Sequence, residues 1–295
     1  MNLLAGLPDI AAITVVRDEA AMLPRWVAHY AKQCGGPDRL LVLDDNSTDG
    51  STDDLPCPVI RLPEREHEEW AVTRLRMVNA FATGLLQSFD AVLFADADEF
   101  LVADPDKHAD LRELVAARPD VKALGAMAFN IVHRVGVEEP LDPQRPVLRQ
   151  RRIAKFIPKM CKPAIKRGTG HWASGSHGLR MPYDIDPELF LFHLKFADRD
   201  HLAATAAHRR ELAEETGRGA DASWRLGDEL VEMLDNLGAP AKLKDVPWFR
   251  LRPEQLEQVV EQQEETLWVS TGGGQTRAMR ERPFVRIPMR IVDTF

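Results

Sequence analysis

Three apolar runs in the first third of the chain, each ending in polar residues, constrain the fold more than any other feature. Residues 10–16, 40–43 and 91–95 have the length and apolar character of buried strands. Segments with helical spacing of apolar residues lie between them, and residues 71–85 are the clearest example. Apolar strands that alternate with helices form a parallel sheet covered on both faces. The sequence therefore predicts an α/β domain.

The polar clusters after these runs mark the expected ligand site, because ligands bind beyond the carboxyl ends of strands in such sheets. The clusters span residues 17–19, 44–49 and 96–99. In the third cluster, Asp96 and Asp98 are two residues apart, and residues 99–101 are expected to continue as a short apolar turn. Proteins hold Mg²⁺ or Mn²⁺ with one or two carboxylates plus substrate phosphates, so we expect a divalent cation here. Taken alone, such a pair is also compatible with a solvated strand end.

No glycine-rich phosphate loop follows the first run, so backbone amides are not expected to bind a diphosphate. A metal ion and basic side chains would take that role. Asp45 is expected to accept from a base N–H or a ribose hydroxyl, and Asp49 to cap a following helix. Asp18 is expected to cap the helix after the first run. A phosphatase with an aspartyl nucleophile is disfavoured, because Phe100 occupies the position where a hydroxyl residue is usual.

The bulk properties exclude some classes of function. The 295 residues suffice for one large α/β domain or two small ones, and the net charge of −8 argues against a nucleic-acid partner. No run of eighteen apolar residues and no secretory signal is present, so we expect no transmembrane segment. The three cysteines are far apart, which fits free thiols in the cytoplasm.

The middle of the chain is basic, whereas the protein as a whole is acidic. Residues 143–183 contain ten Lys or Arg and no Asp or Glu. We expect this window to bind a diphosphate or an anionic acceptor, with Lys159 in a strand as the best single candidate. A solvated loop is the alternative. His171, Trp172 and His177 are acceptor-side candidates. His171 with Trp172 could form a platform for a sugar, since aromatic rings pack on the apolar faces of sugars, and ordinary packing is the alternative for Trp172. His177, in a polar loop, is also a candidate metal ligand.

The ordered motifs resemble those of glycosyltransferase family 2. The matching segments are residues 13–19 (ITVVRDE), 41–51 (LVLDDNSTDGS) and 93–100 (LFADADEF). The Asp-x-Asp-Glu-Phe form is similar to the branch of bacterial family 2 proteins related to family 92. The resemblance covers about the first third of the chain. It implies the glycosyltransferase-A fold, a Rossmann-like and mainly parallel sheet flanked by helices.

The resemblance implies a metal-dependent hexosyltransferase-type enzyme. It would use Mn²⁺ or Mg²⁺, a UDP- or GDP-sugar as donor, and a saccharide, lipid or protein acceptor. Asp98 would bind the metal, Asp96 would lie near the metal or the ribose, and His193 would be a third ligand unless it is an ordinary histidine. The donor-binding residues implied by resemblance and position are Val16, Arg17, Glu19, Asp44, Asp45, Arg74, Arg76, Asn79, Asp96 and Lys159.

The catalytic base is not identified by any motif. Many family members are inverting and use a carboxylate to deprotonate the acceptor hydroxyl. The candidates by position are Glu138, Glu139, Asp142, Asp184 and Asp186. A sugar nucleotidylyltransferase is an alternative, although it would carry a glycine-rich loop after the first strand. A catalytically silent nucleotide-sugar-binding protein is another.

The expected organisation is a glycosyltransferase-A domain over residues 1–197 followed by a mainly helical region over residues 198–295. The first part divides into a nucleotide-sugar-binding half, residues 1–104, and an acceptor half, residues 105–197. In the C-terminal region we expect helices over residues 201–216, 224–237 and 255–267, followed by a mobile tail.

Overall fold

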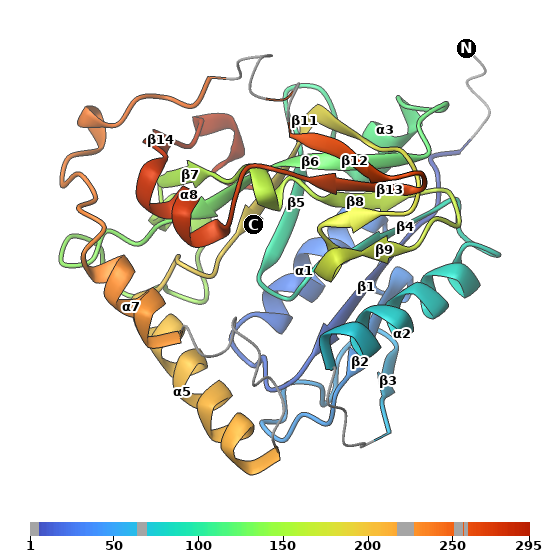
Figure 1. Ribbon diagram of the computed structural model, residues 1–295, viewed down its shortest axis with the longest axis horizontal. Coiled ribbons are helices and arrows are strands. Elements are labelled where there is room, and N and C mark those ends of the chain that lie inside the picture. The colour runs from blue at the N-terminus through green and yellow to red at the C-terminus, as the bar shows by residue number, and fades with distance from the viewer. Residues whose placement is uncertain (1–5, 64–69, 217–226, 251–255, 257–258) are drawn as a thin grey trace.

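The computed structural model describes residues 6–63, 70–216, 227–250, 256 and 259–295, which form a mixed α/β protein (Figure 1). Over these residues a ten-stranded sheet forms the centre, helices flank it, and a second sheet of four strands lies beside it. None of the described helices is long and apolar enough to cross a membrane. The expected α/β class is confirmed.

Parallel strands form the N-terminal half of the large sheet. Their order is β3 (Val59–Arg61), β2 (Leu40–Asp44), β1 (Ile10–Val16) and β4 (Ala91–Phe94). β1, β2 and β4 are buried along their whole length, as their apolar sequences predict. Ala12 packs with α1 (Leu23–Cys34) on one face, and Ile13 packs with α2 (Trp70–Leu85) on the other. Alternate residues of a strand thus serve the two faces.

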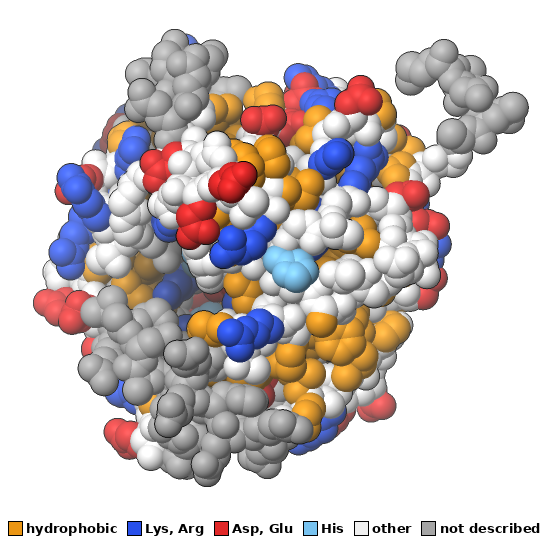
Figure 2. Space-filling model, turned by 45° about the vertical axis from the view of Figure 1, so that its right-hand side comes forward, with side chains coloured by type: hydrophobic (Ala, Val, Ile, Leu, Met, Phe, Trp, Pro, Cys, Tyr) orange, Lys and Arg blue, Asp and Glu red, His pale blue; other side chains and the backbone are white. Residues whose placement is uncertain are grey.

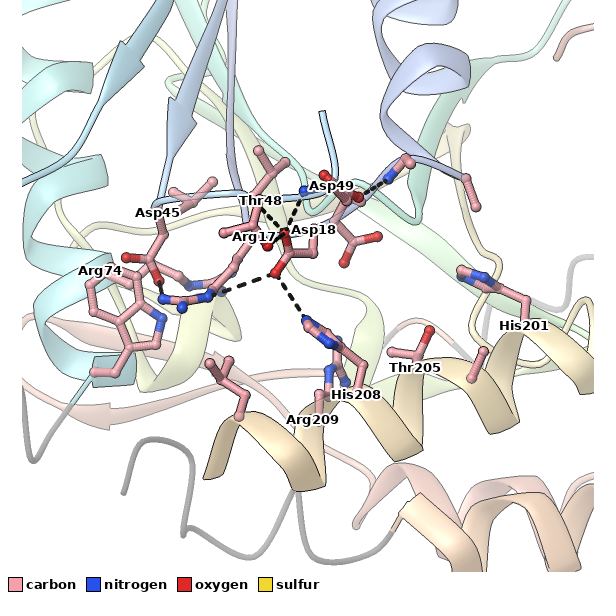
Figure 3. A pocket seen from close by; sticks show the side chains of 18 residues that line it. Arg17, Asp18, Asp45, Thr48, Asp49, Arg74, His201, Thr205, His208 and Arg209 are labelled. Carbon is pink, nitrogen blue, oxygen red and sulfur yellow. Dashed lines mark hydrogen bonds and ion pairs between the residues drawn. The ribbon is translucent and has the colours of Figure 1, made fainter. Parts of the chain in front are cut away.

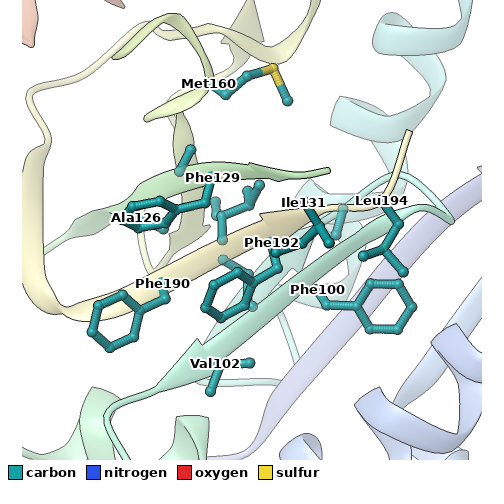
Figure 4. Packing of buried hydrophobic residues seen from close by; sticks show 14 of the residues in the cluster. Phe100, Val102, Ala126, Phe129, Ile131, Met160, Phe190, Phe192 and Leu194 are labelled. Atoms are coloured by element: carbon teal, nitrogen blue, oxygen red, sulfur yellow. The ribbon is translucent and has the colours of Figure 1, made fainter. Parts of the chain in front are cut away.

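The other half of the sheet is mostly antiparallel. Its strands are β8 (Pro163–Lys166), β6 (Ala123–Ile131), β7 (Ile153–Phe156), β14 (Phe284–Arg286), β11 (Asp184–His193) and β5 (Glu99–Ala103). β11 is parallel to β6 and antiparallel to β5, and its register pairs His193 with Glu99. Phe129 and Phe192 pack in the core of this half, with ring centroids 6.0 Å apart (Figure 4). This packing holds His193 beside the turn that contains Asp96 and Asp98.

The C-terminal residues complete both sheets. The small sheet has the order β12 (Val260–Glu264), β13 (Leu267–Ser270), β10 (Gly178–Leu179) and β9 (Trp172–Ala173). Among the described residues, the α-helices of this part of the chain are α3 (Leu111–Ala116), α4 (Val147–Gln150), α5 (Arg199–Thr216), α7 (Gly227–Asp235) and α8 (Gln275–Glu281). β13 pairs with β10 and β14 pairs with β7, so strands after residue 198 extend sheets begun before it. A functional boundary at residue 197 stays a prediction.

The helix expected over residues 255–267 is wrong where the structure describes it. Residues 260–264 form β12, and the two residues Glu265 and Thr266 connect β12 to β13. Glu and Gln favour a helix intrinsically, but pairing of β12 with β13 overrides that preference. The tail expected to be mobile contains α8 and β14, which pack against the sheet.

Two expected caps and one expected turn are also wrong. α1 begins at Leu23 after Met22, so Asp18 does not cap it. No helix follows Asp49 in the described stretch up to residue 63, where residues 50–54 form turns. Residues 99–101, expected as a turn, belong to β5. The carboxylates of Asp18 and Asp49 instead accept from amides of each other's loops, and β5 pairs with β11, contacts that local patterns do not reveal.

Candidate active site

A cavity of about 550 Å³ opens at the carboxyl ends of β1 and β2 (Figure 3). Val15, Val16 and Arg17 line it from the end of β1, and Asp45 lines it from the end of β2. α5 forms the opposite wall, and Arg74 and Trp70 contribute from α2. The cavity lies where ligands bind in open α/β sheets, as the strand-end clusters predicted.

Asp18 connects the three segments around this cavity. Its backbone is left-handed (φ 54°), a conformation that Asp tolerates better than most residues. Its carboxylate accepts from the amides of Thr48 (2.6 Å) and Asp49 (3.2 Å), and it pairs with His208 of α5 at 3.0 Å. Burial raises the pKa of Asp18, but the Thr48 amide and the His208 charge outweigh burial and leave that pKa below its usual value. Asp18 therefore joins the loops after β1 and β2 to α5.

The two aspartates after β2 have different surroundings. Asp45 is buried but lines the cavity, with Arg17 Nη1 3.8 Å from its Oδ2. Asp44 does not line the cavity, because its carboxylate accepts from the Ser47 amide at 2.8 Å and from the Thr52 hydroxyl at 3.3 Å. Asp45 is thus placed to meet a ligand, and Asp44 closes the loop that carries it.

The Asp96–Asp98 turn sits beside the cavity with both carboxylates paired. Arg74, which lines the cavity, donates to Asp96 at 2.8 Å. His193 Nε2 lies 3.1 Å from Asp98 Oδ2. Burial alone would raise the pKa of both aspartates, but the Arg74 charge at Asp96 and the His193 imidazole at Asp98 keep each pKa below its usual value. Both carboxylates are therefore ionised at neutral pH.

A buried ion pair supports this turn from behind. Lys162 Nζ lies 2.7 Å from Glu99 Oε2, and both side chains are almost completely inaccessible. The same Glu99 oxygen accepts from the Asp96 amide at 3.1 Å. Lys162 also contacts the Ser176 hydroxyl at 3.2 Å. One cation of the basic window thus orients the Asp96–Asp98 turn instead of binding a ligand itself.

Glu19 lies where the large cavity meets a smaller one. The smaller cavity, of about 40 Å³, is lined by Glu19 and Asp98. Burial raises the pKa of Glu19 to about 8, and the charges of Asp98 and Asp96 add to the shift. Among the described residues, no group donates a hydrogen bond to the Glu19 carboxyl group. A partly buried acid that faces two cavities without a donor is characteristic of a functional site.

The metal-ligand set expected from the sequence fits a divalent cation in part. Asp98 and His193 present a carboxylate oxygen and an imidazole nitrogen 3.1 Å apart. His193 Nδ1 contacts Asn130 Oδ1 at 2.8 Å, the kind of second contact that orients a metal-binding imidazole. In the described residues, no group of three or more His, Cys, Asp or Glu side chains is arranged to hold a metal. Two protein ligands plus substrate oxygens would suit Mn²⁺ or Mg²⁺.

Several predicted donor-site residues lie outside the two cavities. Arg76 is exposed on α2. Asn79 exchanges two hydrogen bonds of 2.9 Å with the backbone of Trp172 and so ties α2 to β9. Lys159 lies in a 3₁₀ turn, not the expected strand, and donates to the Ser270 carbonyl at 2.9 Å. A donor contact by these residues stays a prediction.

The acceptor-side candidates are also outside the cavities. The Trp172 ring is 2% exposed and its Nε1 donates to the Pro163 carbonyl, so the sugar platform expected there is wrong and packing is its role. His177 Nδ1 contacts the Lys159 carbonyl, and burial lowers the pKa of His177 to about 4. His171 is exposed.

None of the five predicted base candidates lines either cavity. Glu138 pairs with Arg134 at 2.7 Å, and Asp186 pairs with Arg118 at 2.8 Å. Glu139, Asp142 and Asp184 are exposed. Their chain positions had suggested them, but the fold directs them away from the Asp96–Asp98 turn.

The basic window does not form one anion-binding surface in the described residues. Lys155 and Lys166 donate to the Met279 and Gly170 carbonyls, and Arg167 donates to three carbonyls around α3. None of its ten cations lines the two cavities. On the face in Figure 2, the described Lys and Arg side chains are interspersed with acidic and apolar ones. Other cations of the window pair with carboxylates that lie outside it in the sequence, such as Lys162 with Glu99 and Arg149 with Asp293.

Sequence reasoning missed the wall formed by α5. Its cavity-lining polar residues are His201, Thr205, His208 and Arg209. Their spacing of four, three and one places them on one side of a helix. That periodicity was the available signal, but polar residues repeat in this way on any solvated helix face, so the pattern alone did not indicate a site.

Comparison with known proteins gives a likeness in fold. Neither a protein-family model nor a curated protein sequence matches the chain significantly. The chain is similar to the mannosyltransferase PcManGT from Pyrobaculum calidifontis in complex with GDP-Man and Mn²⁺, with 18% identity, coverage of 78% of this chain and 70% of that chain, and a TM-score of 0.36.

It is also similar to S. aureus TarS 1-349 in complex with UDP, with 15% identity, coverage of 77% and 71% of the two chains, and a TM-score of 0.37. Against another S. aureus TarS structure the identity is 14%, the TM-score is 0.37, and the match covers 84% of this chain but 46% of that chain. These likenesses concern the overall fold and assign no residue a role.

Proposed function

We propose that the chain is a glycosyltransferase of the A-type fold that moves a sugar from a nucleoside-diphosphate sugar to an acceptor hydroxyl. The observation that carries the proposal is the cavity at the ends of β1 and β2. Asp45, Arg74 and Glu19 line it, Arg74 pairs with Asp96, and Asp98 lines the adjoining small cavity together with Glu19. Its volume of about 550 Å³ suits a ligand of nucleotide-sugar size.

The donor would lie with its base near Asp45 and its diphosphate towards the Asp96–Asp98 turn. Asp45 offers a carboxylate acceptor in a buried position, which suits base N–H donors. Arg17, 3.8 Å from Asp45, offers a cation on the same side. Arg74 brings a second cation to Asp96, and a ribose hydroxyl could donate to that aspartate.

Asp98 and His193 would hold Mn²⁺ or Mg²⁺. The contact of His193 Nδ1 with Asn130 Oδ1 orients the imidazole so that Nε2 lies 3.1 Å from Asp98 Oδ2, which places a nitrogen and a carboxylate oxygen together as candidate ligands. Such an ion supplies charge that stabilises a departing diphosphate. The chain's own residues orient the site: Glu99 fixes the Asp96 amide, and Lys162 fixes Glu99.

In the proposed reaction, the acceptor oxygen forms a bond to the anomeric carbon while the bond from that carbon to the diphosphate oxygen breaks. The acceptor proton passes to a base, and the nucleoside diphosphate leaves. The finer parts of the proposal are hexosyl transfer, a saccharide, lipid or protein acceptor, membership of the family 2 branch related to family 92, and cytoplasmic action.

The proposal is tested with purified protein and a panel of UDP- and GDP-sugars, with and without Mn²⁺. We expect hydrolysis or transfer of at least one donor only when the metal is present. Asp98→Ala should lower that rate by about 100-fold or more, because a ligand of the charge-stabilising ion is removed. Asp120→Ala, at an exposed position outside both cavities, is the matched control and should keep the wild-type rate.

Binding of a donor without any turnover would indicate a catalytically silent nucleotide-sugar-binding protein instead of an enzyme. Turnover that survives Asp98→Ala would show that the metal is held elsewhere or is not needed. Failure of every donor to bind would remove the nucleotide-sugar assignment.

A further inference from the structure

One wall of the large cavity is a single face of α5. The α5 residues that line it are His201, Ala204, Thr205, His208, Arg209 and Leu212. Figure 3 shows the labelled members of this set on the helix side that faces the loops after β1 and β2. We call this set the α5 wall.

Charge is segregated across the cavity. The acidic lining residues Asp18, Glu19, Asp45 and Asp49 all come from the loops after β1 and β2. The α5 wall contains two histidines, an arginine and a threonine, and no acid. α5 does carry acidic residues, but none of those that the structure describes lines the cavity. The wall is therefore the part of the cavity suited to an anion.

Cations line both sides of the cavity. Arg17 lies within 4 Å of Asp45 and Asp18, and Arg74 donates to Asp96. On α5, His208 pairs with Asp18, yet its side chain stays 44% exposed. Arg209 lines both the large and the small cavity, so it lies at their junction, beside Glu19.

We propose that the α5 wall, through Arg209, His208 and Thr205, binds the diphosphate of the ligand in this cavity. The inference rests on the proposed function for the identity of that ligand. A guanidinium, an imidazole and a hydroxyl are all donors to phosphate oxygens, and a guanidinium can donate two parallel hydrogen bonds. With no glycine-rich loop after β1, side chains take over the task that backbone amides perform in dinucleotide folds.

The test compares two adjacent arginines of one helix. Arg209 lines the cavity, whereas Arg210 pairs with Asp228 and lines neither cavity. Titration calorimetry measures the affinities of UDP, GDP, their nucleosides uridine and guanosine, and inorganic pyrophosphate. We expect Arg209→Ala to weaken binding of the favoured nucleoside diphosphate and of pyrophosphate by about 10- to 100-fold and to leave nucleoside affinity unchanged. Arg210→Ala should bind all of them as the wild type does.

Two further variants separate a direct contact from a structural role. Arg209→Lys keeps the charge without the planar fork and should recover part of the lost affinity. His208→Gln keeps a donor group of similar reach and should weaken diphosphate binding less than His208→Ala. Circular dichroism and thermal melting verify that each variant is folded.

Two results would overturn the inference. One is diphosphate affinity that is unchanged in folded Arg209→Ala. The other is an equal loss of nucleoside and nucleoside-diphosphate affinity, which would indicate a general distortion of the cavity. The proposed function is tested separately. Protein that binds pyrophosphate through Arg209 but turns over no donor would support diphosphate binding by the α5 wall and contradict the transferase activity. Donor turnover that is unchanged in Arg209→Ala would support the transferase activity and contradict diphosphate binding by the α5 wall.

Discussion

At the scale of single residues, Glu19 shows a conflict between stability and ligand binding. Its carboxyl group is partly buried near Asp98 and Asp96 and has no hydrogen-bond donor among the described residues. Such an arrangement is unfavourable in the ligand-free protein and becomes favourable when a ligand donor or a cation approaches. Functional sites often retain local instability of this kind.

We therefore predict that Glu19→Gln stabilises the ligand-free protein and impairs function. Burial raises the folded-state pKa of Glu19 to about 8, so the folded protein binds more protons than the unfolded chain between about pH 4.5 and 8. Over that window the free energy of unfolding of the wild type should fall as pH rises. The Gln variant lacks this titration and should exceed the wild type by about 1–3 kcal/mol at pH 8.

Urea unfolding at pH 5, 6.5 and 8 in metal-free buffer checks this prediction. Parallel pH profiles for the wild type and the Gln variant would contradict it. Unchanged donor turnover in Glu19→Gln would contradict the functional half of the prediction.

The sequence identified some site residues because their type and position were both informative. Asp45 and Asp98 follow apolar runs of strand length, so each could be placed at a strand end. His208 and Arg209 were missed because a histidine and an arginine on an amphipathic helix have no distinguishing local pattern. The contact of His208 with Asp18 spans 190 residues of chain, so it arises from tertiary packing, as does the place of Arg209 in the cavity that Asp98 lines.

At the scale of elements, the sequence predicts the strands that are buried on both faces. It does not predict strands whose conformation depends on pairing with a neighbouring strand. β1, β2 and β4 are continuous apolar runs and were predicted nearly to the residue. β12 is exposed and rich in Glu and Gln, and its strand form depends on its pairing with β13. The sequence predicts a turn over residues 99–101, but these residues belong to β5, which begins directly after the Asp96–Asp98 turn.

Glu188 shows how side chains join elements of the second half of the sheet. It lies in β11, and its carboxylate pairs with Lys107, with His108 at 2.8 Å and with Arg118 at 2.7 Å. The first two partners precede α3, and Arg118 follows it. The hydrogen bonds from Lys107 and His108, aided by Arg118, lower the pKa of Glu188 to about 2.

We predict that these contacts stabilise the protein above about pH 4.5, and that the stabilisation is lost as pH falls towards 2. A lowered folded-state pKa means that the unfolded chain binds more protons in this window, so acid favours unfolding. Glu188→Gln should be less stable than the wild type at pH 7 and should lose less stability between pH 5 and 3. Urea unfolding measures both, with Glu229→Gln at an exposed site of α7 as the control. An acid dependence identical to the wild type would contradict the prediction.

At the scale of the whole molecule, the cavity joins segments from the start, middle and later part of the chain. Val15 and Asp45 line it from the first sheet strands, Arg74 from α2, and Leu212 from the far end of α5. A ligand in the cavity therefore bridges both halves of the protein. Because it binds the folded state and not the unfolded chain, it must raise the free energy of unfolding, by about 2.7 kcal/mol at a concentration 100 times its dissociation constant.

This coupling leads to a prediction about metal removal. UDP or GDP with Mn²⁺ should raise the melting temperature by more than the sum of the shifts that nucleotide and metal produce alone, because the ion would bind Asp98, His193 and the diphosphate together. EDTA should remove the excess. Asp98→Ala should also remove it but should keep the smaller shift from nucleotide alone, since Asp45 and Arg17 line the large cavity and Asp98 lines only the small one. Additive shifts in the wild type would show that metal and nucleotide bind independently, and would contradict a shared site.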